Sequence, residues 1–163
     1  MRSDTRTLVL LAVETAVLEV AKRALDFLPN VELITFLFIV FTLKTGVKKT
    51  LIVSLIFSFI EMMIFGIGTW TMVYFYIWPI LILAVHLLPE NSGRLTYAVT
   101  AGAYGLIFGM LCAPVTFVIG GWQAAAAWWV AGIPYDLIHC VSNFLVCFLL
   151  FDPVMKAMEY IPF

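Results

Sequence analysis

Three polar residues lie at helical spacing in an apolar stretch near the carboxyl end of the chain. Asp136, His139 and Asn143 stand at positions i, i+3 and i+7, so a helix presents them as one stripe. Polar groups inside a membrane are costly and usually face a protein interior or a wet cavity. We interpret the stripe as the wall of a binding cavity, with helix-to-helix hydrogen bonding as the alternative. The aromatic residues just before it are Trp128, Trp129 and Tyr135.

Asp136 and His139 are also residue types that do acid–base chemistry, since a carboxylate orients the imidazole in many hydrolases. The sequence contains no GxSxG, no HExxH and no paired-carboxylate motif beside them. It also lacks the phosphate-binding GxxxxGK[ST] motif, so a partner chain would have to supply energy for uphill transport. We predict a non-enzymatic protein with no catalytic residue, metal site or cofactor.

Four carboxylates lie within or beside apolar segments. Glu61 has no basic residue near it in sequence, so it requires a partner across the bundle or a water-filled cavity. It could also offer hydrogen-bond acceptors to a polar ligand. Glu32 precedes an apolar run, where a helix N-terminus favours negative charge. Glu14 is expected to meet Lys or Arg, and Glu19 to pair with Arg23 at i, i+4.

The composition is that of an integral membrane protein. Of 163 residues, 64% are hydrophobic and 12% charged, with a mean hydropathy of +1.08. Soluble domains carry about 25% charged and 45–50% apolar residues. The net charge of −1 argues against a nucleic-acid partner. Three cysteines without metal-ligand spacing are read as small buried residues, namely Cys112, Cys140 and Cys147.

Apolar runs predict an all-α fold, a single domain over residues 1–163 with six transmembrane helices. Glu14 interrupts the first run, so we expect it to remain as a span and not to be a cleaved signal. Asn30 is the predicted N-cap of the short second span. A flexible or short-helical outer loop is expected around Gly120-Gly121 and Ala124–Ala127, where it could cover the site. The predicted spans are approximately 7–28, 31–43, 50–67, 72–88, 95–119 and 133–151.

Charge and aromatic residues orient these spans. An alternating path leaves only Lys22 and Arg23 on one side, which is then the outside, so both termini are cytoplasmic. All five tryptophans then fall in the outer half, which predicts an aromatic site open to the outside, with a one-sided interfacial belt as the alternative. The cytoplasmic basic residues are Arg2, Arg6, Lys44, Lys48, Lys49, Arg94 and Lys156, and the tryptophans are Trp70, Trp78, Trp122, Trp128 and Trp129.

Ala12 and Ala16 form a small-xxx-small pair in the first span. Small residues let a second helix approach closely. The pair is either a docking face for a partner subunit or ordinary packing inside the bundle.

Together these features resemble the substrate-binding S component of energy-coupling factor (ECF) vitamin transporters. Ala12–Ala16 resembles that family's first-helix motif, which contacts the coupling subunit. Three stretches also resemble bacterial S components: FLPNVELITFLFIVFTL (27–43), YFYIWP (74–79) and AGIPYDLIHCVSNF (131–144).

The resemblance implies a multi-pass protein of the bacterial cell membrane that binds a vitamin or related micronutrient from outside. Its partners would be a membrane coupling subunit and two cytoplasmic ATPases, and it would topple in the membrane to release substrate. Signatures of the thiamine, riboflavin, biotin and folate branches are not seen, so a cobalamin-type ligand is preferred. The predicted binding residues are Glu61, Trp70, Tyr74, Trp78, Trp122, Trp128, Trp129, Tyr135, Asp136, His139 and Asn143.

Two other readings stay open. Scaffold proteins of the MreD-like rod-shape type are also small with about six spans, but need no aromatic cavity. A solitary small-solute carrier often shows inverted repeats, and no convincing repeat is present.

Overall fold

The computed structural model describes residues 2–89 and 92–160, with side chains from Thr5 onward. Within this part of the chain all regular structure is helical, which confirms the all-α prediction. The helices are α1 (Arg2–Leu25), α2 (Ile34–Thr45), α3 (Val47–Phe65), α4 (Thr69–His86), α5 (Arg94–Leu106) and α6 (Phe108–Met158).

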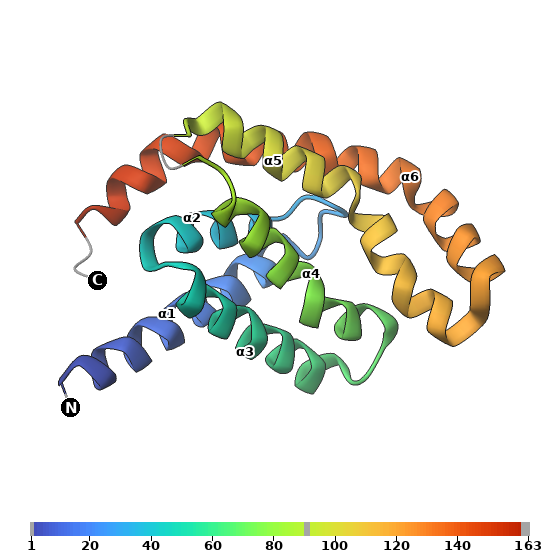
Figure 1. Cartoon of the computed structure of the whole chain (residues 1–163), viewed down its shortest axis with the longest axis horizontal. Coiled ribbons are helices and arrows are strands. Elements are labelled where there is room, and N and C mark those ends of the chain that lie inside the picture. The colour runs from blue at the N-terminus through green and yellow to red at the C-terminus, as the bar shows by residue number, and fades with distance from the viewer. Residues whose placement is uncertain (1, 90–91, 161–163) are drawn as a thin grey trace.

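The chain runs back and forth along one direction (Figure 1). Helix α1 begins and α6 ends toward the same end of the molecule. The turn between α3 and α4 and the reversal within α6 lie toward the opposite end. An ion pair between Arg94 and Asp152, with 3.0 Å between Nη1 and Oδ2, joins the start of α5 to the last part of α6.

The predicted break between the last two spans falls within α6, where the chain reverses direction at Gly121, whose φ of 75° and ψ of −174° are not helical. The departure from the predicted boundaries is that the second segment is helical over 122–158 and not only over 133–151. Alanine is the strongest helix former, so the run Ala124–Ala127 continues the helix and does not form a flexible loop. The reversal makes 94–120 and 122–158 the two arms of a long helical hairpin (Figure 1).

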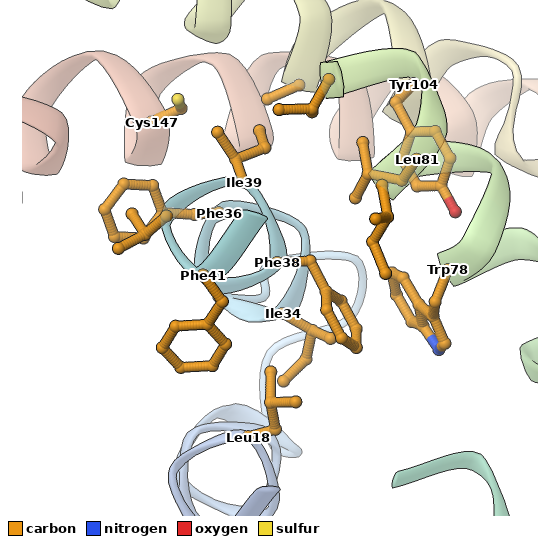
Figure 2. Packing of buried hydrophobic residues seen from close by; sticks show 14 of the residues in the cluster. Leu18, Ile34, Phe36, Phe38, Ile39, Phe41, Trp78, Leu81, Tyr104 and Cys147 are labelled. Carbon is orange, nitrogen blue, oxygen red and sulfur yellow. The ribbon is translucent and has the colours of Figure 1, made fainter. Parts of the chain in front are cut away.

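Helix α2 forms the centre of the core. It is apolar on every side, and such helices are stable only when they are surrounded. Phe38, Ile39 and Val40 are fully buried. Figure 2 shows α2 end-on, with side chains from four other helices around it. These neighbours include Leu18 of α1, Trp78 and Leu81 of α4, Tyr104 of α5 and Cys147 of α6.

Glycines hold α5 against α6. A Cβ on Gly105 would lie 2.7 Å from the carbonyl oxygen of His139, and one on Gly102 would lie 3.2 Å from that of Cys140. Only glycine permits such a close backbone approach. The close packing of α5 on α6 therefore fixes the position of the His139 backbone relative to the other helices. Cys112 and Cys147 are buried, as predicted, while Cys140 is half-buried.

Among the described residues, two helical stretches, Thr69–His86 and Arg94–Met158, are by length and composition apolar enough to cross a membrane. Many large apolar side chains are exposed on the outer faces, for example Val20, Ile67 and Val118. Since a water-soluble protein rarely exposes a continuous apolar surface, both features support membrane association.

Candidate ligand-binding site

A cavity of about 270 Å³ lies where the loop after α1 meets α4 and the α6 hairpin. The loop residues 28–32 form one side of the cavity. Lys22 and Asp26 line it from the end of α1 and the start of the loop. Aromatic rings line the remaining side. They belong to Tyr74 and Trp78 of α4 and to Phe108 and His139 of α6.

Aromatic rings form a continuous wall from α4 to α6. Trp70, Tyr74 and Trp78 are four residues apart, so they share one face of α4. Their ring centroids are 5.4 Å apart between Trp70 and Tyr74 and 5.3 Å apart between Tyr74 and Trp78. Trp78 continues to Phe108 at 6.3 Å, and Phe108 meets the His139 ring edge-to-face at 4.8 Å. Tyr74, Trp78, Phe108 and His139 of this row line the cavity and offer a flat molecule several ring faces and edges, whereas Trp70 is not among the lining residues.

Glu61 of α3 is fully buried, and Lys22 Nζ and Arg23 Nη2 of α1 both donate to its carboxylate. The expectation of a partner across the bundle is confirmed. Lys22 Nζ also lies 3.3 Å from the Tyr74 hydroxyl and 4.6 Å from the Trp70 ring centroid. Cations are attracted to aromatic faces, so these rings help to hold the ammonium group at the edge of the cavity.

The second polar element of the site is a contact between α6 and the loop before α2. His139 Nε2 lies 3.2 Å from Glu32 Oε1, and because a carboxylate only accepts, the imidazole is the donor. Glu32 Oε2 accepts the backbone N–H of Thr35 at 2.8 Å. Glu32 therefore occupies the N-terminus of α2, as predicted, and also orients the imidazole.

The predicted capping role of Asn30 is wrong. Leu33 holds the N-cap position of α2 and makes no side-chain cap bond. Asn30 instead adopts a positive φ of 57°, and its carbonyl oxygen accepts the Ser142 hydroxyl at 2.7 Å. Because the longer Glu32 side chain reaches the free N–H of Thr35, the helix start is satisfied without Asn30.

The predicted stripe on α6 is buried along its whole length, but its members do different things. His139 lines the cavity, whereas the Oδ1 of Asp136 accepts the backbone N–H of Gly109 at 3.0 Å. Asn143 Nδ2 donates to the Thr35 hydroxyl at 3.2 Å. The contacts of Asp136 and Asn143 thus match the helix-to-helix alternative, and His139 is the member of the stripe that lines this cavity.

Four predicted aromatic residues lie away from this cavity. Trp122, Trp128, Trp129 and Tyr135 are on the hairpin of α6 and are exposed, with Trp122 the most exposed at 72%. Trp129 and Asp136 line a separate apolar cavity of about 270 Å³ between the arms of the hairpin. The structure therefore does not bring the predicted aromatic cover to the site, because these rings lie exposed on the helical hairpin.

Several residues that line the cavity were not predicted to bind ligand, among them Lys22, Asp26, Glu32 and Phe108. Lys22 entered only the charge count, and Phe108 is one of 14 phenylalanines without a distinguishing neighbour. Trp78, which was predicted, has a further property. Its indole Nε1 is buried and has no hydrogen-bond partner in the part of the chain that the structure describes. Buried polar groups are normally paired, so this donor needs an explanation.

The predicted docking pair lies on the free side of α1. Ala12 and Ala16 are exposed, whereas Glu14 and Leu18 face inward. Glu19 and Arg23 are 3.4 Å apart between Oε2 and Nη2, as the i, i+4 spacing predicted.

Comparison of the chain with protein-family models, with curated proteins and with solved structures finds no match. The function must therefore be inferred from the geometry and chemistry of the site.

Proposed function

We propose that this chain is the substrate-capture subunit of an ECF-type importer for a small vitamin or related micronutrient. The observation that carries the proposal is the cavity walled by Tyr74, Trp78, Phe108 and His139. Small-molecule sites are typically concave and apolar, with a few placed polar groups. Here the polar groups are the side chains of Lys22, Asp26 and Glu32 and the ring nitrogens of Trp78 and His139.

The path of the chain supports six crossings of a membrane with an outward cavity. The crossings would be α1, α2, α3, α4, the arm 94–120 and the arm 122–158. Since α1 begins and α6 ends toward one end (Figure 1), both termini would share the cytoplasmic side. Lys44, Lys48, Lys49, Arg94 and Lys156 stand at helix ends on that side, and cytoplasmic ends are rich in such residues.

The volume of the cavity limits the size of the ligand that can bind. At about 270 Å³ it is near the lower limit for small-molecule sites. It suits one heterocycle with short substituents and is much smaller than a corrinoid. The volume therefore favours a ligand smaller than cobalamin.

Helix α1 supports a coupling partner. Ala12 and Ala16 are exposed together with Val9, Val13 and Val20, so α1 presents a smooth apolar face to its surroundings. A partner helix can pack closely against such a face. The same helix carries Lys22 into the cavity, so one rigid element would join the partner surface to the ligand.

The first test is retention of a small molecule. Purified protein should carry a vitamin-sized compound that mass spectrometry detects, and adding this compound to emptied protein should quench tryptophan fluorescence. Trp78→Ala should weaken binding, whereas Trp122→Ala, at an exposed site, should not. Equal binding by the two variants would remove the cavity from the proposal.

The second test is the partner surface. Ala16→Trp should abolish co-purification with a coupling subunit while ligand binding stays unchanged, because the bulky ring blocks helix approach. Ala103→Trp is the matched control, since Ala103 is also exposed but lies on α5. Unchanged co-purification of the Ala16→Trp protein would contradict the docking role.

A further inference from the structure

We infer that the cavity takes a small planar heterocycle that is neutral or positively charged, and that it rejects anions such as carboxylates and phosphates. The inference rests on the proposed function for the direction of entry, and it adds the chemical class of the ligand. Three features of the cavity support the inference: the charge of its lining residues, the shape of its aromatic wall and the unpaired N–H of Trp78.

Negative charge is in excess around the cavity. The buried carboxylate of Glu61 compensates Lys22, and Arg23 is shared among Glu61, Glu19 and Asp26. Among the described residues, the cation that Glu32 meets is His139, and only when the imidazole is protonated. The carboxylates that line the cavity are Asp26 and Glu32, and Lys22 is the one permanent cation among the lining residues that the structure describes. An added anion meets repulsion that the low dielectric of a buried site strengthens.

The aromatic wall favours a flat ring. Tyr74, Trp78 and Phe108 present ring faces and edges in sequence along the cavity. Aromatic pairs stack or meet edge-to-face, and a cationic ring gains further from the electron-rich faces. The loop 28–32 lines the other side, and the volume of about 270 Å³ suits a small ring system.

The indole Nε1 of Trp78 supplies a hydrogen-bond donor. Trp78 is only 3% exposed, and this nitrogen has no partner among the described residues. Figure 2 shows the nitrogen on the end of the indole that is turned away from Leu81 and Tyr104 of the core. A ligand with a ring nitrogen or carbonyl oxygen would satisfy this donor.

Glu32 supplies the complementary acceptor. Each of its oxygens accepts one bond, from His139 and from Thr35, and a carboxylate oxygen can accept two. An N–H or a positive charge on the opposite edge of the ligand would use this remaining capacity. The ligand is thus expected to carry an acceptor on one edge and a donor or cation on the other.

Three probes of nearly equal size test the charge rule, namely nicotinamide, 1-methylnicotinamide and nicotinate. Their binding to the whole protein in lipid nanodiscs is measured by calorimetry and by tryptophan quenching. Nicotinamide and its cationic methyl derivative should bind at least about tenfold more tightly than nicotinate, because like charges close together in a buried site repel strongly.

Two conservative variants test the polar contacts. Trp78→Phe keeps a ring but removes the N–H, so affinity for nicotinamide should fall by roughly 3- to 10-fold, the usual effect of one hydrogen bond. Glu32→Gln should weaken 1-methylnicotinamide more than nicotinamide, since only the charge is lost. Trp122→Phe and Glu159→Gln are exposed controls that should change neither affinity. Thermal unfolding of each variant checks that it is folded.

The outcomes separate this inference from the proposed function. A retained planar molecule that is neutral or cationic, or the predicted probe order, supports the inference. A retained anion, or tighter binding of nicotinate, overturns it but leaves the import function standing. Protein that retains nothing and binds none of the three probes overturns both.

Discussion

The buried carboxylate of Glu61 allows a quantitative stability prediction. Glu61→Leu replaces it with an apolar side chain of similar size and leaves the cations of Lys22 and Arg23 without their shared partner. Breaking a buried pair by removing one member typically costs about 3–5 kcal/mol, because the remaining charge is desolvated and unpaired. The variant should therefore unfold much more easily than the parent protein.

Arg23 and Lys22 differ in the interactions that they retain after the substitution. The Arg23 side chain is 34% exposed and retains Glu19 and Asp26 at 3.4 and 3.2 Å, so its loss is small. The Lys22 side chain is 15% exposed and retains the Tyr74 hydroxyl at 3.3 Å and neighbouring rings. We therefore expect the lower end of the range, about 3 kcal/mol, which for a chain of this size lowers Tm by roughly 6–12 °C.

Thermal unfolding in detergent measures the effect. The double variant Lys22→Met/Glu61→Leu should recover part of the lost stability, because it leaves no unpaired ammonium group. Arg94→Gln is the matched control. It breaks a pair whose side chains are 49% and 60% exposed, and such pairs contribute about 1 kcal/mol or less. If Glu61→Leu lowers Tm no more than Arg94→Gln does, the reasoning about buried charge is refuted.

Three further predictions concern the helices that position the site. Gly105→Ala should lower Tm, since its Cβ would lie 2.7 Å from the His139 carbonyl, whereas Gly132→Ala meets no atom within 4 Å and should raise Tm slightly. Gly121→Ala should destabilise the hairpin by about 1–3 kcal/mol in unfolding experiments, because its backbone angles are restricted to glycine. Asp136→Ala leaves the Gly109 N–H without its acceptor and should cost about 1–3 kcal/mol, while ligand affinity measured by tryptophan quenching stays unchanged. A loss of affinity at constant Tm in that last variant would instead place Asp136 at the ligand.

Local patterns predicted much of the helical framework. Apolar runs and their breaks located the helices to within a few residues, apart from the second segment of α6, which begins at 122 and not at 133. Tyr74 and Trp78, two of the predicted binding residues, do line the cavity, and their rings are in contact. The spacing of the α6 stripe correctly identified its inward face, because periodicity reports which side of a helix is buried.

Such patterns could not predict which buried side chains contact one another. Lys22 and Glu61 are 39 residues apart, and His139 and Glu32 are 107 apart. Periodicity says that a side chain faces inward but does not say which helix it meets. For the same reason the tryptophans of α6 were predicted to cover the site, although the structure leaves them exposed on the hairpin.

The sequence by itself determined an apolar, all-helical chain with buried polar positions that had to find partners, since unpaired charges are too costly in an apolar interior. Only the tertiary structure decided which of these positions surround a cavity and which serve helix packing. That decision depends on the close approach of α5 to α6 at Gly105 and on the reversal at Gly121. Both are set by backbone geometry between distant segments, which residue types along one helix do not encode.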